Sequence, residues 1–233
     1  MATIYNDGTY LSQNPTWHEE DSPFKANAIA NMLVKNQVSF SSICEVGCGT
    51  GGVLRNLRKL CGGTNTKWVG FDISENAIAL AKKNPESSGI VFEAKDVFRL
   101  DETFDVMLVV DVFEHVPDYM GFIRACKERA RYKIYHIPLD MHVSAALRES
   151  YLVARNSVGH LHYFSEKTAL ATLSDTGHEV IDATLTPGAL ELSRLHPSFK
   201  TTLANVPRLV VGQFNVSLAA RLFGGYSLLV LTK

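Results

Sequence analysis

Short apolar runs alternate along this chain with stretches whose apolar residues recur every three or four positions. The run 104–111, FDVMLVVD, is apolar almost throughout, which is typical of a strand buried on both faces of a parallel sheet. The stretch 53–60, VLRNLRKL, repeats its apolar residues at helical spacing. Ser74 and Ser165 are predicted helix N-caps. Strands are predicted at 41–46, 67–72, 89–96, 104–111, 132–138, 178–186 and 226–233, and helices at 25–36, 53–60, 74–84, 117–130 and 165–177.

This alternation predicts a doubly wound α/β fold, because right-handed crossovers place helices on both faces of a mostly parallel sheet. A single domain of 233 residues is expected. Three prolines interrupt one less regular segment, which we interpret as a helical or loop insertion. The predicted parts are an N-terminal helical cap or lid (1–40), a cofactor-binding core (41–186), the insertion (187–224) and the last strand (225–233).

Four glycines follow the first predicted strand in ICEVGCGTGG, residues 43–52. Gly47, Gly49 and Gly52 match GxGxxG, and Gly47, Gly49 and Gly51 equally match GxGxG. Glycines at the end of a strand permit a tight turn and let a ligand approach the backbone closely. Asp72 follows at the spacing of a ribose-binding acid. Two ligand classes remain open at this point: a nicotinamide or flavin dinucleotide, and an adenosyl cofactor without phosphates.

Carboxylates stand at the ends of four successive predicted strands: Glu45, Asp72, Asp96 and Asp111. Singly, each is more simply a helix cap or a solvated turn residue. Together they would lie at one edge of a parallel sheet, where they would repel a pyrophosphate and attract a sulfonium and an ammonium group. Asp72 suits the ribose hydroxyls, Asp96 the adenine amine, and Glu45 with Asp111 the positive methionine end. The charge pattern therefore favours a cationic adenosyl ligand.

The stretches ICEVGCGTGGVLRNL, GFDISENAIALAK, EAKDVF and FDVMLVVDVFEHVPD, in this order, resemble the consecutive motifs of class I S-adenosylmethionine-dependent methyltransferases. GHLHYFSEKTALATLSDTGHEVI resembles the region before the last helix and strand of small-molecule members, so the similarity covers about residues 40–185. It implies a Rossmann-like seven-stranded sheet with an antiparallel last strand. It also implies S-adenosyl-L-methionine as cofactor and S-adenosyl-L-homocysteine as product. The segment 187–224 departs from the family pattern.

The resemblance also implies site residues. Asp72 would hold the ribose, Asp96 the adenine with Val97 beside the ring, and the residues around Asp111 would flank the reacting methyl group. The leader YLSQNPTWHEEDSPFKANAI resembles leaders of methyltransferases linked to sugar or polysaccharide biosynthesis; Trp17, His18 and Lys25 are its candidate cofactor contacts, against the plainer interpretation that they only pack or are solvated. The implied cofactor-binding set is Lys25, Glu45, Gly47, Cys48, Gly49, Gly51, Asp72, Ile73, Asp96, Val97, Asp111, Val112 and Phe113.

Methyl transfer from a sulfonium is an in-line displacement, so the protein mainly positions and desolvates a nucleophile. A hydroxyl acceptor also needs a base, and histidine is the residue best suited near neutral pH. His115, His136 and His160 are the candidate bases, and His142 and His162 belong to the same predicted sheet edge. For His115 the plainer interpretation is a residue that orders its loop, and for the others it is a wall of the acceptor site.

A metal-dependent variant would need ligands such as His136, Asp140, His142 or His160, but their spacing matches no standard site, so no metal is expected. The four cysteines form no CxxC pair and are interpreted as reduced thiols. The net charge of −1 predicts neither a nucleic-acid nor a membrane partner. We expect a cytoplasmic protein, since the N-terminus lacks a signal-peptide pattern and the sequence lacks an apolar run of about 18 residues. An oligomer is compatible with the sequence. The stretch NVPRLVVGQFNVSLAARLFGG could cover the acceptor pocket, form a dimer contact or lie on a membrane surface, and the plainer, preferred interpretation is ordinary packing against the sheet.

The leading hypothesis is an S-adenosylmethionine-dependent methyltransferase acting on a small-molecule acceptor, at a hydroxyl group, with a sugar as one candidate. The first alternative is an NAD-dependent oxidoreductase, for which the chain shows no evident Tyr-x-x-x-Lys pair. The second is a non-catalytic module that only binds the cofactor. The fold alone does not identify the acceptor, because acceptor sites are built from variable loops on a common sheet.

Overall fold

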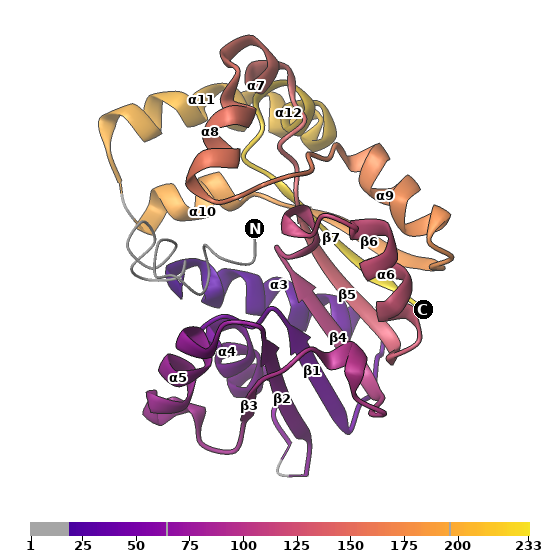
Figure 1. Cartoon of the computed structure of the whole chain (residues 1–233). Helices are drawn as coiled ribbons and strands as arrows, with labels where there is room; N and C mark the ends of the chain where they lie inside the picture. The colour runs from indigo at the N-terminus through magenta and orange to yellow at the C-terminus, as the bar shows by residue number, and fades with distance from the viewer. Residues whose placement is uncertain (1–18, 64, 196) are drawn as a thin grey trace.

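The computed structural model describes residues 19–63, 65–195 and 197–233. Its centre is one seven-stranded sheet in the order β3-β2-β1-β4-β5-β7-β6 (Figure 1). Trp17 and His18, two of the candidate cofactor contacts, lie outside the described residues. The strands are β1 (Ser42–Val46), β2 (Lys67–Asp72), β3 (Val91–Ala94), β4 (Phe104–Val110), β5 (Ala130–Pro138), β6 (Val180–Thr186) and β7 (Ser227–Thr232).

The pairing of the strands confirms the predicted fold class. β1 lies between β2 and β4 and runs parallel to both, with Glu45 opposite Gly70 on one side and Leu108 on the other. β7 runs antiparallel to β5 and to β6. The sheet is therefore the doubly wound, mostly parallel one expected, with an antiparallel last strand. Because β1 to β5 are parallel, the residues that follow them meet at one edge of the sheet.

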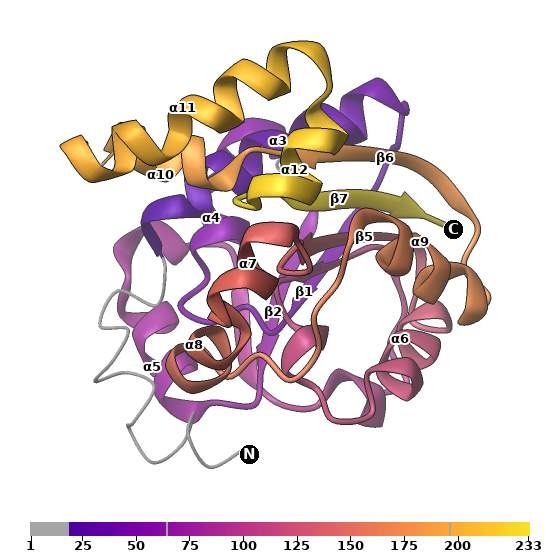
Figure 2. The same ribbon diagram turned by 90° about the horizontal axis from the view of Figure 1, so that it is seen from above.

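Helices cover both faces of the sheet (Figure 2). One face packs against α3 (Ser22–Lys35), α4 (Gly52–Cys61) and α5 (Glu75–Lys83), and the other packs against α6 (Tyr119–Lys127) and α9 (Glu166–Asp175). Each face has its own apolar core, as expected for a sheet buried on both sides. The predicted caps are present, since the hydroxyl oxygens of both serines accept hydrogen bonds from backbone amides at the starts of α5 and α9.

Five helices follow the carboxyl ends of β5 and β6, and we call them the strand-end helices. They are α7 (Val143–Arg148), α8 (Ser150–Ser157), α10 (Gly188–Leu195), α11 (Phe199–Phe214) and α12 (Val216–Phe223). Figure 1 shows them together above the sheet edge, with α7 next to α12. The segment described in the sequence as a helical or loop insertion is thus helical, and α7 and α8 are helices that the sequence patterns did not predict.

Four short 3-10 turns complete the described elements: η1 (Glu19–Asp21), η2 (Pro85–Ser87), η3 (Val97–Arg99) and η4 (Phe113–His115). The last of these follows β4 directly and brings its residues to the carboxyl edge. Within the described ranges, every helix is too short or too polar to cross a bilayer.

Candidate active site

The glycine loop after β1 needs glycine for its backbone conformation. Gly47, Gly49 and Gly51 have φ angles of +71°, +53° and +81°, which side chains disfavour. A Cβ atom on Gly47 would lie 2.6 Å from a methyl carbon of Val112. The amides of Gly47 and Cys48 both donate to the carbonyl oxygen of Phe71, at 2.8 and 3.0 Å. The loop is therefore pressed between the ends of β2 and β4.

Asp72, the last residue of β2, is fixed by backbone amides. Its Oδ2 accepts a hydrogen bond from the Gly49 amide at 2.8 Å, and its Oδ1 accepts one from the Ser74 amide at 2.8 Å. Burial raises the pKa of this carboxyl, and the amides partly oppose that shift. The acid expected to hold the ribose thus lies directly beside the glycine loop.

The strand order sets the order of the four acids along the edge: Asp96, Asp72, Glu45 and Asp111. They belong to or follow four adjacent strands, β3, β2, β1 and β4. Neighbouring strands are about 4.8 Å apart, so this row is roughly 14 Å long. Asp96 lies at the more exposed end, where its Oδ1 caps η3 by accepting from the Phe98 amide at 3.0 Å.

Glu45 is buried in the middle of this row. Burial raises its pKa to about 8; Asp72 and Asp111 add to the shift, and Lys25 opposes it. Its Oε2 atom has no hydrogen-bond partner among the described residues. A buried, unsatisfied carboxyl oxygen is costly to the fold, so this atom fits the position of a missing positively charged donor.

Asp111 is held by the side chains of Lys25 and His136 at the end of β4. Lys25 Nζ lies 2.7 Å from its Oδ2 and 2.8 Å from Asp21, while His136 Nδ1 lies 2.6 Å from its Oδ1. Burial would raise the pKa of Asp111, but Lys25 and His136 hold it well below its usual range. Burial would likewise lower the pKa of Lys25, and the carboxylates of Asp111 and Asp21 raise it instead.

The remaining expected cofactor residues differ in their surroundings. Val112 touches the glycine loop, whereas Ile73 is exposed and Val97 is buried. The ring of Phe113 packs in the apolar core, 5.1 Å from Phe164 between ring centroids. Ile73 therefore lies at the surface, Val112 beside the glycine loop and Phe113 in the core, and their contacts with a cofactor stay predictions.

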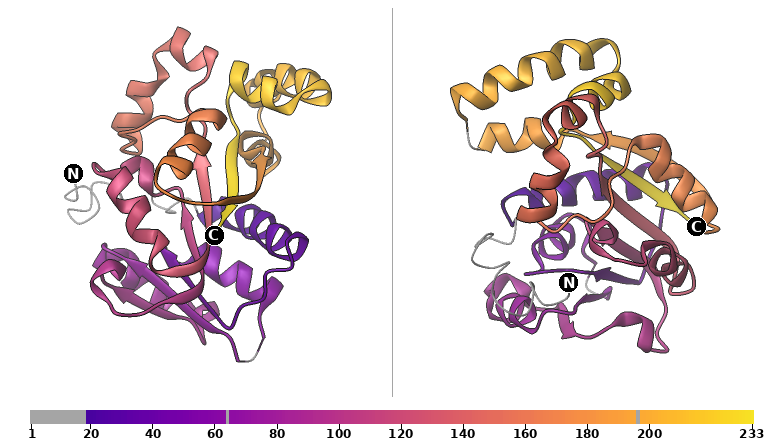
Figure 3. Two further views of the ribbon diagram at one scale, coloured as in Figure 1. Left: turned by 90° about the vertical axis from the view of Figure 1, so that its right-hand side faces the viewer. Right: turned by 45° about the horizontal axis from the view of Figure 1, so that its top comes forward.

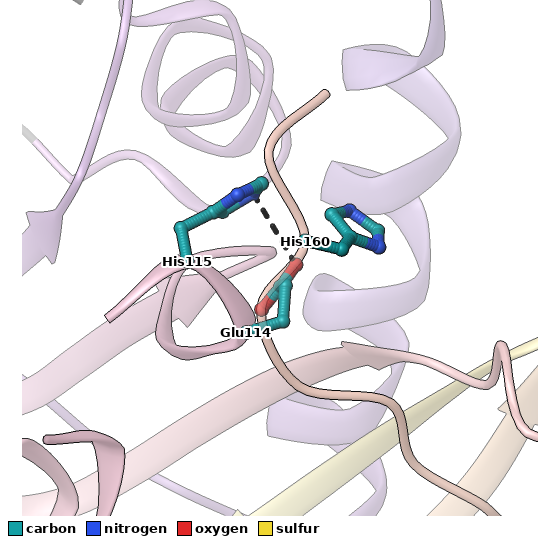
Figure 4. Close-up of side chains that lie close together, drawn as sticks. All are labelled: Glu114, His115 and His160. Atoms are coloured by element: carbon teal, nitrogen blue, oxygen red, sulfur yellow. Dashed lines mark ion pairs between the residues drawn. The ribbon is translucent and has the colours of Figure 1, made fainter. Parts of the chain in front are cut away.

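Two histidines meet where η4 faces the segment before α9. His160 Nδ1 lies 2.5 Å from Asp140 Oδ2, and the rings of His115 and His160 are 4.9 Å apart (Figure 4). The amides of Leu161 and His162 both donate to the backbone oxygen of Glu114, at 2.8 and 3.1 Å. These two hydrogen bonds join segments that are far apart in the sequence.

Glu114 is buried beside the two histidines. Neither of its carboxyl oxygens has a hydrogen-bond partner among the described residues, and its pKa is raised well above the usual range by burial and then by Asp111. Burial, reinforced by His160, lowers the pKa of His115 to about 4, so its ring is neutral at neutral pH. Ligand atoms of Glu114, His115 and His160 lie within 4.8 Å of one another. That spacing would also admit a cation, and the absence of a metal stays a prediction.

The other histidines are engaged elsewhere. His136 uses both ring nitrogens, on Asp111 and on the Thr186 hydroxyl at 3.1 Å. His142 Nδ1 accepts from the Ala145 amide at 3.1 Å and so caps α7. His162 lies with its ring 4.4 Å from that of Tyr119. Sequence reasoning did not single out Glu114 or Tyr119, and it considered Asp140 only as a metal ligand; the 20-residue gap between Asp140 and His160 gave no signal of their pairing.

A sheet of this order, with a glycine loop after β1 and an acid at the end of β2, defines the class I type of nucleotide-binding methyltransferase fold. Residues 17–183 match a family described as "Methyltransferase domain". The chain belongs to that family.

Among curated proteins, the ubiquinone biosynthesis O-methyltransferase of Pseudomonas putida F1 is 33% identical over 122 residues. The match covers 47% of this chain and 51% of that protein, so the chain spans about half the length of the curated relatives it matches. A counterpart from Pseudomonas syringae pv. tomato is also 33% identical over 122 residues, with the same coverage.

Two solved structures share the fold at low sequence identity. Magnesium protoporphyrin IX methyltransferase from Synechocystis PCC 6803, with bound S-adenosylhomocysteine, superimposes with a TM-score of 0.60 at 15% identity, covering 90% of this chain and 82% of that one. The plantazolicin methyltransferase BpumL gives a TM-score of 0.61 at 17% identity, covering 99% and 91%. The family, the fold class, S-adenosylmethionine as donor and the enzyme class expected from the sequence are confirmed. The findings favour this donor over the NAD alternative.

Proposed function

We propose that this methyltransferase methylates a hydroxyl group of a small, ring-bearing acceptor, and that His160 is the base. The observation that carries this proposal is the 2.5 Å contact between His160 Nδ1 and Asp140 Oδ2 at the carboxyl edge of the sheet. A carboxylate on one ring nitrogen fixes the tautomer and leaves the other nitrogen free to accept a proton. Such a pair is needed for an oxygen acceptor, whose proton must be removed.

Two further facts support an oxygen acceptor with a ring. The curated relatives are named O-methyltransferases, and that name belongs to them until this chain is tested. Aromatic side chains also lie close to the His160 segment: Tyr119 against His162, and Tyr151 against Tyr163 with centroids 4.9 Å apart. Flat rings of this kind pack against phenols and sugars alike, so both classes are candidates.

The donor fits the row of acids through three of its members. Asp96 would accept from the adenine amine, Asp72 from the ribose hydroxyls, and the unsatisfied Glu45 Oε2 would face the positive methionine end. Bound S-adenosylmethionine supplies a methyl group on a sulfonium that is already electrophilic. In this proposal Lys25 holds Asp111 in place, and it reaches a methionine carboxylate only by releasing one of its two acids.

The chain's own residues would then position and deprotonate the acceptor. His160 Nε2 would take the hydroxyl proton as the oxygen attacks, and Asp140 would stabilise the resulting imidazolium. His115, kept neutral by burial, would act as a hydrogen-bonding neighbour that does not compete for this proton. His136 is disfavoured as the base, because both of its ring nitrogens are engaged.

The test combines an acceptor panel with two variants. The full chain is incubated with S-adenosylmethionine and catechol, 3,4-dihydroxybenzoate, glucose or an aromatic amine, and release of S-adenosylhomocysteine is measured. We expect turnover with a hydroxylated acceptor. His160→Ala should lower that turnover by ~10²–10⁴-fold, while the affinity for S-adenosylhomocysteine, measured by calorimetry, stays unchanged.

His136→Gln is the matched control, since Gln can keep a hydrogen bond to Asp111 while it cannot act as a base. Its turnover should remain closer to that of the natural chain than the turnover of His160→Ala. Two results would overturn the proposal: methylation of the amine alone, or full turnover in His160→Ala.

A further inference from the structure

Helix α11 turns an apolar face outward. Phe199 and Phe214, at its two ends, are 84% and 87% exposed. Leu203, Val206 and Val210 are also exposed and continue this line at intervals of three or four positions, so the five residues lie on the same side of the helix. We call this side the outer stripe of α11; it consists of Phe199, Leu203, Val206, Val210 and Phe214.

The opposite side of α11 is held to the protein by polar groups. Asn205 is buried and donates to the Ser193 hydroxyl at 2.8 Å. The Arg208 guanidinium donates to the backbone oxygens of Gly224 at 2.8 Å and Phe223 at 3.0 Å. A surface helix normally buries its apolar stripe and exposes its polar residues. Here that arrangement is reversed, so the outer stripe is not explained by packing within the described chain.

The charge of the surrounding segment is one-sided. Residues 188–224, from the start of α10 to the residue after α12, contain four of the 23 Lys and Arg residues and one of the 24 Asp and Glu residues, Glu191, which pairs with Arg194 at 2.6 Å. This segment therefore carries a charge of +3, and the rest of the chain carries −4. The overall charge of −1, from which we expected no membrane partner, is the sum of these two opposite charges. Arg221 on the neighbouring helix α12 is exposed.

We propose that α11 docks on the surface of a bilayer that contains anionic phospholipids, with its outer stripe in the headgroup region. An apolar helix face with a basic surrounding segment is the pattern of helices that lie in the membrane interface, buried about 5–10 Å deep. Both attractive contributions come from one segment: the stripe supplies apolar area, and the net positive charge of the segment, with Arg221 exposed, attracts acidic headgroups. Figure 3 shows α11 at the periphery of the molecule, where a flat surface can reach it.

The charge of this segment favours an anionic bilayer over a second copy of the chain as the partner of α11. Two copies that met through α11 would bring two segments of charge +3 together, and like charges oppose such an interface. An anionic bilayer instead gains from the same charge. The proposal goes beyond methyl transfer and does not depend on which acceptor is used.

The test is flotation of the full chain with vesicles of phosphatidylcholine alone or of equimolar phosphatidylcholine and phosphatidylglycerol. We expect binding to the phosphatidylglycerol vesicles, weaker binding in high salt, and little binding to phosphatidylcholine alone. Phe199→Gln with Phe214→Gln should lower the vesicle partition coefficient about tenfold or more. Both phenylalanines are exposed, so the thermal midpoint and the affinity for S-adenosylhomocysteine should not change.

Val34→Gln with Leu60→Gln is the matched control. These apolar residues are 74% and 51% exposed near the C-terminal ends of α3 and α4, away from α11. The control should float like the natural chain. The proposal is overturned if the natural chain binds neither vesicle, if the control loses binding equally, or if light scattering shows a dimer that the α11 variant dissociates.

Discussion

The two halves of the site are built in different ways. On the proposed donor side, the glycine loop and the row of carboxylates lie at the ends of adjacent parallel strands, and Asp72 is fixed by main-chain hydrogen bonds from Gly49 and Ser74. On the acceptor side, His160 and Asp140 come from loops 20 residues apart and are held by a side-chain contact. The residue positions on the donor side are therefore set by the ends of adjacent strands. Those on the acceptor side depend on the tertiary packing of loops.

This contrast predicts which substitutions should lower stability and which should lower turnover alone. Buried charges and positive φ angles are unfavourable by themselves and persist because the surrounding structure compensates for them. Substitutions at these positions should therefore lower the free energy of unfolding together with the affinity for the donor. Residues on partly exposed loops should change turnover while the fold persists. The following variants of the donor side test the first half of that statement.

Lys25→Met should have the largest effect. It leaves the carboxylates of Asp111 and Asp21 near the sheet edge without their shared cation, and loss of one partner from a buried pair costs about 3–5 kcal/mol. Urea unfolding followed by circular dichroism measures this free energy. The control is Lys35→Met, whose exposed ammonium pairs with Asp182 and should cost less than about 1 kcal/mol. Equal losses in the two variants would contradict the distinction.

Gly47→Ala should come next. The new Cβ would require φ of +71° and would lie 2.6 Å from Val112, which together should cost about 3 kcal/mol. Donor affinity should fall as well, because the loop must shift. Gly188→Ala is the matched control, since nothing lies within 4 Å of its added Cβ. Thermal unfolding and calorimetry with S-adenosylhomocysteine check both variants; an unchanged Gly47→Ala protein would mean that the loop is not constrained.

Glu45→Gln should have the smallest effect, and that effect should depend on pH. The folded pKa of Glu45 is raised to about 8, so its contribution is fully present below its unfolded pKa of about 4.5 and is lost as the pH rises toward 8. The natural chain without cofactor should therefore lose on the order of 2 kcal/mol more than Glu45→Gln between about pH 5 and about pH 7. Urea titrations at several pH values measure the difference; parallel curves for the two proteins would refute it.

The sequence predicted where the glycine loop and the row of acids lie in the fold, because local patterns determine these positions, while their roles toward the donor stay predictions. An apolar strand followed by glycines, and acids at strand ends, are visible in ICEVGCGTGG and around Asp72. The acceptor side depends on contacts across long distances in the chain, such as His160 with Asp140. The strand-end helices α7 and α8 have weak apolar periodicity, so the sequence pattern did not predict them. Pro207 made α11 hard to predict, because proline usually ends a helix, but α11 continues through it. The reversed faces of α11 also follow from tertiary packing, which spacing alone does not predict.

The two amides of Leu161 and His162 that donate to Glu114 have a consequence for evolution of the enzyme. They hold the segment that carries His160 to the turn that carries His115. Both rings would therefore keep their relative positions if neighbouring helices shifted. α7 and α8 can then diverge in sequence while the spacing of the imidazoles is preserved. With His160 as the proposed base, a lineage built on this plan could acquire new acceptors without rebuilding the group that removes the proton.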